Sequence, residues 1–223
     1  MASQLEKQSV SVVLRGNFNP AIFQPSWFAL QNLIRLSEAE AARVEIIHPD
    51  ATVFTAEWLV VNVTGDRFHA STTQEAYYET LRDLVMGVFD LLRHTPLRVM
   101  GLNRDFHYRT SSKEAWHSLG HRLAPIGDWE SVLRKLGMLN VTMQGERPDN
   151  LDGYIQVKVE PSKLVEHGVY VAVNDHYNLR AGDPATDGTP KLLRILGDGE
   201  HWKASMDQSL GIAQTIAGLG EVG

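Results

Sequence analysis

The stretch Thr73–Arg93, TQEAYYETLRDLVMGVFDLLR, is the longest predicted helix, and the rest of the fold is interpreted around it. Its apolar residues recur every three or four positions, so they share one face of the helix. The residues of this face are Tyr77, Leu81, Leu84, Val85, Val88 and Leu92. Phe89 and Leu91 widen the face, which favours packing on a sheet, and Pro96 ends the helix.

The segments on either side of this helix have a similar order of predicted elements. Alternating apolar residues predict strands, and helical spacing predicts helices. Before it we expect a strand over 8–17, a short helix from residue 25, and strands within 44–47, 51–54, 57–64 and 67–72. After it we expect a strand over 97–108, helices over 113–123 and 128–136, strands over 139–144, 154–159 and 169–173, a loop over 180–190, and a helix over 200–219.

Both halves therefore contain a strand, a short helix, a three-strand meander and a long helix. This order predicts an α+β fold with one largely antiparallel sheet and long helices on one face. We interpret residues 1–223 as a single domain with an internal duplication, its pseudo-repeats being 1–95 and 96–223. Trp27 and Trp116 occupy matching places near the starts of the two short helices. The layout resembles the saddle of the TATA-box-binding protein family, but the chain has no motif of that family, so the resemblance implies nothing about function.

Composition favours an ordinary cytoplasmic protein. Apolar residues make up 43% of the chain and charged residues 22%, and there is no cysteine. No run approaches the ~18 apolar residues of a membrane span. The net charge of −6 argues against a globally basic nucleic-acid-binding protein.

The sequence has no recognised catalytic or cofactor-binding motif. It lacks a phosphate-binding loop of the form GxxxxGK[ST], a GxSxG elbow and an HExxH helix. We therefore assign no catalytic residue and expect no cofactor.

The histidines are the remaining candidates for chemistry. His117 and His121 are four residues apart on the predicted 113–123 helix, a spacing that can hold a metal ion. No glutamate lies between them to act as a base, and we interpret them as surface or capping histidines, with no metal site. His107 and His176, in the cleft between helices and sheet, form the basis of an alternative function as a small-ligand-binding or hydrolytic domain.

A basic segment over 97–123 supports a second alternative. Four of its residues are candidate contacts for a phosphate or an acidic partner. They are Arg104, Arg109, Lys113 and Arg122. A nucleic-acid contact through this segment is the corresponding function, although strand alternation divides Arg104 and Arg109 between two faces.

The favoured interpretation is a non-enzymatic subunit or adaptor of a bacterial cytoplasmic multi-protein assembly, with a role in defence as one setting. Its partner is another protein or a second copy of the chain. A sheet with helices on one face leaves its other face available, and alternation places Tyr154, Gln156 and Lys158 there together. Trp58 occupies the matching place in the first half, so these four residues are the candidate interface.

Overall fold

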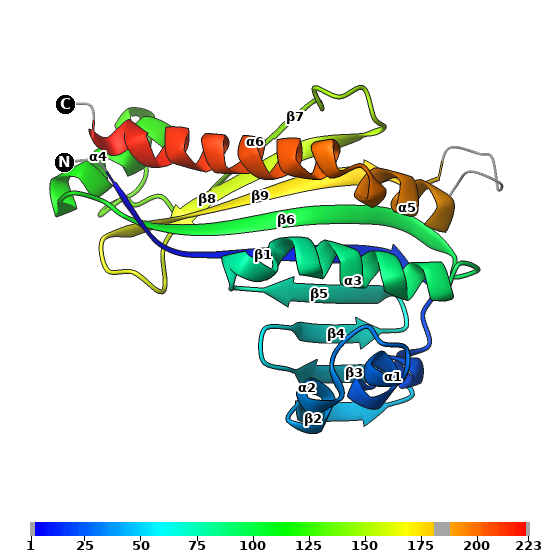
Figure 1. Ribbon diagram of the computed structural model, residues 1–223. Helices are drawn as coiled ribbons and strands as arrows, with labels where there is room; N and C mark the ends of the chain where they lie inside the picture. The colour runs from blue at the N-terminus through cyan, green and yellow to red at the C-terminus, as the bar shows by residue number, and fades with distance from the viewer. Residues whose placement is uncertain (1–2, 181–187, 222–223) are drawn as a thin grey trace.

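A computed structural model describes residues 3–180 and 188–221 of the chain. Within these residues, nine strands form one antiparallel sheet in the order β2-β3-β4-β5-β1-β6-β9-β8-β7 (Figure 1). The strands are β1 (Gln4–Gly16), β2 (Arg43–His48), β3 (Ala51–Thr55), β4 (Val60–Thr64), β5 (Arg67–Thr72), β6 (Leu97–Arg109), β7 (Val141–Gly145), β8 (Gly153–Pro161) and β9 (Gly168–Asn178). The predicted α+β class is confirmed.

The described helices lie between and after these strands. They are α1 (Pro25–Leu30), α2 (Leu36–Glu40), α3 (Tyr78–Leu91), α4 (Lys113–Leu123), α5 (Thr189–Gly197) and α6 (Gly199–Gly218). Short 3-10 turns occur at Pro20–Ile22, Glu75–Tyr77, Gly127–Trp129 and Leu219–Glu221. None of the helices in residues 3–180 and 188–221 is long and apolar enough to cross a membrane.

The two longest strands lie at the centre of the sheet. β1 pairs with β6, and each is flanked by the last strand of the meander that follows it in the chain: β5 beside β1 and β9 beside β6. The meander before α3 has four strands and the one after α4 has three. This arrangement agrees with the expected similarity of the halves, and the duplication itself stays a prediction.

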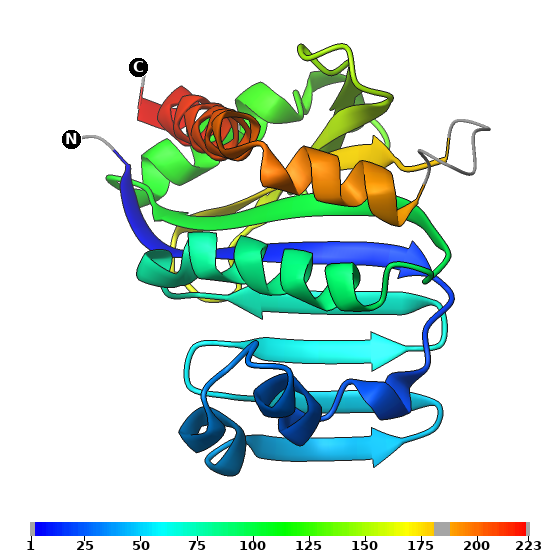
Figure 2. The same cartoon turned by 45° about the vertical axis from the view of Figure 1, so that its right-hand side comes forward.

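The long helices α3, α5 and α6 lie across the same face of the sheet (Figure 2). Leu84 and Val88 of α3 are buried in one apolar cluster with β1 and β5, and Met206 of α6 joins it. Ala213 of α6 is buried in a second cluster with strands β6 and β9. Each cluster excludes water between a helix and alternate strand residues, which is the main stabilising term for such a sheet.

Two tryptophans that were matched in sequence are both half-buried. Trp27 of α1 packs against the first apolar cluster. Trp116 of α4 donates its indole N–H to the carbonyl of Gly168 at 3.0 Å. Neither indole is largely exposed, as the expected anchoring role requires.

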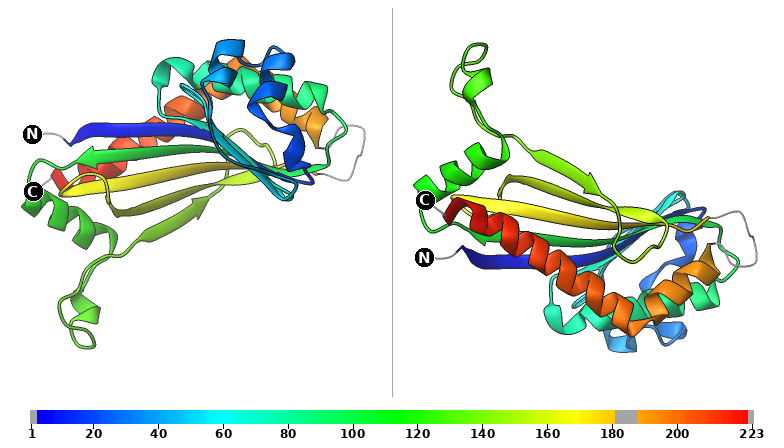
Figure 3. Two further views of the ribbon diagram at one scale, coloured as in Figure 1. Left: turned by 90° about the horizontal axis from the view of Figure 1, so that it is seen from below. Right: turned by 90° about the horizontal axis from the view of Figure 1, so that it is seen from above.

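The structure confirms one of the local predictions between β6 and β7 and corrects others. The predicted 113–123 helix is confirmed, with the Ser112 hydroxyl capping the amide of Ala115 at 3.1 Å. The predicted 128–136 helix is wrong, because only the turn Gly127–Trp129 forms there. This segment between α4 and β7 projects away from the sheet (Figure 3). Residues 181–187 of the predicted loop lie outside the described part, and α5, which the sequence interpretation missed, begins at Thr189.

Candidate binding site on the uncovered sheet face

The sheet face opposite the helices, here called the uncovered face, contains a broad hollow. Its volume is about 530 Å³, and residues of β5, β1, β6, β9 and β8 line it. Strand alternation decides which residues lie there. On β1, for example, Val10, Val12 and Leu14 are buried under the helices, whereas Ser11 and Arg15 line the hollow.

Neutral polar side chains lie side by side across the middle of this hollow. The strand register places Ser11 opposite Asn103, Asn103 opposite Asn174, and Gln156 on the other side of Asn174. Nδ2 of Asn103 donates to Oγ of Ser11 at 3.4 Å. Oδ1 of Asn174 is buried and has no hydrogen-bond partner in the described chain. This row, the amide row, therefore has unused capacity to bind a hydrogen-bonding ligand.

Gly101 lies next to the amide row and forms the floor of the hollow. A Cβ built on Gly101 would meet only side-chain atoms of Asn103 and Asn174, the nearest at 3.5 Å, which is an ordinary contact distance. The glycine is thus not required to prevent a clash. A glycine inside a strand weakens the sheet and often marks a place where a ligand approaches the backbone. The missing side chain leaves room for a bound group.

One end of the hollow carries two arginines. Arg15 of β1 and Arg67 of β5 are direct cross-strand neighbours, and both line the hollow. Arg15 also pairs with Asp66 at 2.5 Å, whereas Arg67 makes no ion pair within the described residues. Burial and then the positive charge of Arg15 lower the pKa of Arg67. His69 follows on β5, and burial together with Arg67 lowers its pKa to about 4, so its ring is neutral at pH 7.

The opposite end of the hollow is closed by internal hydrogen bonds. Asp105 accepts hydrogen bonds from Ser9 Oγ at 3.0 Å and from the Tyr170 hydroxyl at 2.5 Å. Burial raises the pKa of Tyr170, and the hydrogen bond to Asp105 adds to this effect, so the phenol remains a donor. The rings of His107 and Tyr170 pack against each other at a tilt of 30°, with centroids 4.8 Å apart. The hydrogen-bonding capacity of Asp105 is thus used by its neighbours within the protein.

The predicted interface residues fall into two groups. Gln156 and Lys158 line the hollow, and Tyr154 stacks on His176, itself a lining residue, at 4.2 Å with the rings 8° from parallel. Trp58 is only 5% exposed, because its ring stacks on Tyr77 and its N–H donates to the buried Glu38 at 3.1 Å. The expected surface position of Trp58 is therefore wrong.

The four basic candidates do not share one surface. Arg104 is 4% exposed on the helix side, where it contacts the carbonyl and sulfur of Met206, so its assignment as a contact for a partner is wrong. Arg109 is exposed and pairs with Glu6 at 2.7 Å. The remaining two lie on α4, Lys113 at its start and Arg122 in its last turn, where Arg122 donates to the carbonyl of Leu219.

The histidines are also dispersed. His107 and His176 lie on the uncovered face, so the expectation that they line a cleft between helices and sheet is wrong. His107 contacts Ser162 Oγ through Nδ1 at 2.9 Å. His117 and His121 are on α4, beside a separate pocket of about 210 Å³. No cluster of three or more His, Asp or Glu side chains suited to a metal ion occurs in residues 3–180 and 188–221.

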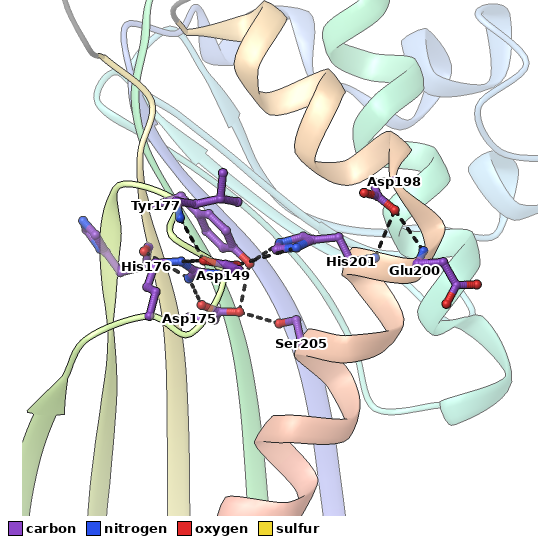
Figure 4. A network of polar contacts seen from close by, with 10 residues as sticks. Asp149, Asp175, His176, Tyr177, Asp198, Glu200, His201 and Ser205 are labelled. Atoms are coloured by element: carbon purple, nitrogen blue, oxygen red, sulfur yellow. Dashed lines mark hydrogen bonds and ion pairs between the residues drawn. The ribbon is translucent and has the colours of Figure 1, made fainter.

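A buried polar network on the helix side was missed by the sequence interpretation (Figure 4). Arg147, in the loop after β7, pairs with Asp149 and with Asp175 of β9. Asp175 also accepts hydrogen bonds from the hydroxyls of Tyr177 at 2.9 Å and Ser205 at 2.5 Å. Burial alone would raise the pKa of Asp149, but the hydrogen bonds from Arg147 and the Leu151 amide, together with the positive charge of Arg147, outweigh burial and lower it.

This network joins a loop to α6 rather than forming an open site. The side chains of Arg147 and Asp175 are each 3% exposed, so a substrate cannot reach them. His201 of α6 contacts the Tyr177 hydroxyl through Nε2 at 2.8 Å. The sequence analysis singled out His176, but the residue that joins this network is its neighbour Asp175.

Comparisons with known proteins add no relative. No protein-family model matches the chain, and no curated protein matches it in sequence.

Proposed function

We propose that this protein is a non-enzymatic binding subunit of a cytoplasmic multi-protein assembly and holds a protein partner on its uncovered sheet face. The observation that carries the proposal is the hollow of about 530 Å³ over five strands, lined mainly by polar side chains. A sheet of this length with one bare, recessed face has a preformed site that needs no refolding to bind.

The chemistry of the lining groups supports binding rather than catalysis. Asp105 already accepts two hydrogen bonds, so it is poorly placed to act as a base. The low pKa of His69 keeps that ring neutral near pH 7 and far from the range in which a general acid operates. What is left free on the face is hydrogen-bonding capacity in the amide row.

Exposed apolar residues support a protein as the partner. The projecting segment between α4 and β7 exposes Trp129 by 57%, Val132 by 68% and Leu133 by 55%. Large apolar side chains that gather on a projecting segment are typical of protein interfaces, and tryptophan is enriched at their centres. A partner that spans the hollow and this segment would use both surfaces.

A small-molecule ligand is the second candidate. The volume of the hollow lies within the ~300–1,000 Å³ range of small-molecule sites. Such sites are usually mostly apolar and enclosed, whereas this hollow is open and polar. The geometry therefore favours a protein partner.

The experiment narrows the hollow beside Asn103 and Asn174 without replacing any of its hydrogen-bonding residues. The Gly101→Val variant places a β-branched side chain on the floor, where a Cβ has room. Gly145→Val is the matched control, because Gly145 ends the exposed edge strand β7 and a Cβ there meets nothing within 4 Å. Tagged wild-type and Gly145→Val proteins should co-purify the same partner from source cells, and Gly101→Val should lose it. Retention of that partner by Gly101→Val would contradict the proposal.

A further inference from the structure

We infer that the segment held in the hollow is an extended acidic peptide, with a carboxylate between Arg15 and Arg67 and a backbone N–H group on the amide of Asn174. This inference names the partner's chemistry and rests on the proposed function of the uncovered face. Two separate features of the hollow carry it: the arginine pair and the unpaired amide.

The arginine pair carries two positive charges and one bound carboxylate, so it is only partly neutralised. Like charges directly opposite each other on paired strands destabilise a sheet unless something lies between them. Arg15 and Arg67 are opposite in register. Among the residues that the structure describes, the one carboxylate paired with either is Asp66, which is exposed and pairs with Arg15. A carboxylate from a partner would receive the planar donors of both guanidinium groups.

Two of the three cations that line the hollow already have a carboxylate partner. Arg15 pairs with Asp66 and Lys158 with Glu160, each at 2.5 Å. Arg67 makes no ion pair within the described residues. An anionic group of a partner would therefore be the first ion-pair partner of Arg67, whereas a cationic group would be repelled by it.

The amide row supplies the second contact. The buried Oδ1 of Asn174 lacks a donor, and leaving such an atom unpaired costs about 1–3 kcal/mol. The terminal torsion of an asparagine rotates readily, so this oxygen can turn toward the space above Gly101. A peptide N–H lying over Gly101 would satisfy it, and Asn103 offers a neighbouring donor for a peptide carbonyl.

The spacing of the two features fits an extended chain. Arg15 and Ser11 are four residues apart on β1, and Asn103 is the neighbour of Ser11 in the register. At roughly 3.3 Å per residue along β1 and about 4.8 Å between neighbouring strands, Arg15 and Asn174, which lies two strands from β1, are about 16 Å apart. About five residues of an extended peptide that crosses the strands obliquely span this distance.

The same observations disfavour a nucleic acid. Single-stranded nucleic acid is bound by a track of cations along its backbone and by aromatic rings free to stack on bases. Here one arginine pair stands alone, and the aromatic rings of the face already contact each other: Tyr154 stacks on His176, and Tyr170 packs against His107 at a tilt of 30°. A single carboxylate fits this arrangement better than a phosphate backbone.

The test selects peptides from a displayed library of random twelve-residue sequences on the full chain. The selected peptides are then measured by fluorescence anisotropy against wild-type protein, Arg67→Gln, Gly101→Val and the control Arg43→Gln. Arg43 is an exposed arginine on β2, outside the hollow and paired with Glu45. Each peptide is also made with its acidic residues changed to glutamine.

We expect selected peptides to contain Asp or Glu and to bind at least tenfold more weakly to Arg67→Gln and to Gly101→Val. Arg43→Gln should bind within twofold of wild type, and the glutamine peptides should bind at least tenfold more weakly. A different result would overturn the inference of an acidic peptide and leave the proposed function standing. In that result, the peptides bind more weakly to Gly101→Val, but neither Arg67→Gln nor the replacement of acidic residues by glutamine changes their affinity. If Gly101→Val binds the peptides as tightly as wild type, or if the library gives no enriched peptide, both the inference and the proposed function are overturned. Displacement of the peptides by an equimolar oligothymidylate would assign the hollow to nucleic acid and overturn the inference.

Discussion

Arg15 of β1 and Arg67 of β5 face each other across paired strands, on the face of the sheet opposite the helices. In the protein without a partner, repulsion between these two positive charges lowers the free energy of unfolding. We expect a double-mutant cycle with Arg15→Gln and Arg67→Gln to give an unfavourable coupling energy of about 0.2–1 kcal/mol at low salt. Urea unfolding at low and high ionic strength measures it, and the coupling should shrink as salt screens the charges. A favourable coupling would mean that the pair stabilises the free protein.

Gly101 lowers the stability of strand β6, in which it lies. Its neighbours leave room for a Cβ, and an interior glycine destabilises a strand by roughly 0.5–1 kcal/mol relative to alanine. Gly101→Ala should therefore raise the free energy of unfolding by about that amount. The measurement is urea denaturation beside Gly145→Ala, at the exposed end of β7. A loss of stability in Gly101→Ala would show that the glycine is needed for the fold itself.

His69 should make stability depend on pH. Its pKa falls from 6.5 to about 4 in the folded protein because of burial and then of Arg67. The unfolded chain binds the proton more readily, so the contribution is complete above pH ~6.5 and is lost as the pH falls toward 4. At about 1.4 kcal/mol per pKa unit, the loss is of the order of 3 kcal/mol.

His69→Gln isolates this effect, because the lowered pKa values of His107 and His176 act in the same direction. The drop in unfolding free energy between pH 7 and pH 4.5 should be smaller in the variant than in wild type. Equal drops in the two proteins would contradict the burial of a neutral His69.

Arg147 should be far more important to stability than the exposed arginines. Arg147→Met leaves the buried carboxylate of Asp175 without its counter-charge, which typically costs about 3–5 kcal/mol. The exposed Arg43–Glu45 pair is the control, since such pairs contribute about 0–1 kcal/mol. Thermal and urea unfolding of Arg147→Met and Arg43→Gln measure the difference. Similar small losses in both variants would mean that Arg147 is dispensable.

Strong local patterns allowed much of the fold to be predicted. Strand alternation correctly divided β6 into a helix-facing side with Arg104 and an opposite side with Asn103. The bounds of α4 followed from the Ser112 cap and the apolar spacing. In contrast, α5 was missed, although Gly188 and Pro190 before Leu192, Ile195 and Leu196 are a helix-start signal followed by an apolar face.

The candidate site was less accessible to sequence reasoning, because it depends on which strands become neighbours. Nothing in the chain order indicates that Arg15 meets Arg67 or that Asn103 meets Asn174, since register is a tertiary property. Trp58 was misplaced for a related reason: it precedes β4, in a bend, so the alternation of the strand does not extend to it. Arg147 and Asp175 join only through folding.

The central claim is that a partner binds on the uncovered sheet face, and an NMR titration of the isotope-labelled chain tests it most directly. The titrant is the partner that co-purifies with wild-type protein. We expect the largest changes at the backbone amide of Gly101 and at the side-chain amides of Asn103 and Asn174, and little change in α3 and α6. Changes confined to the helix side, with Gly101, Asn103 and Asn174 unmoved, would contradict the claim.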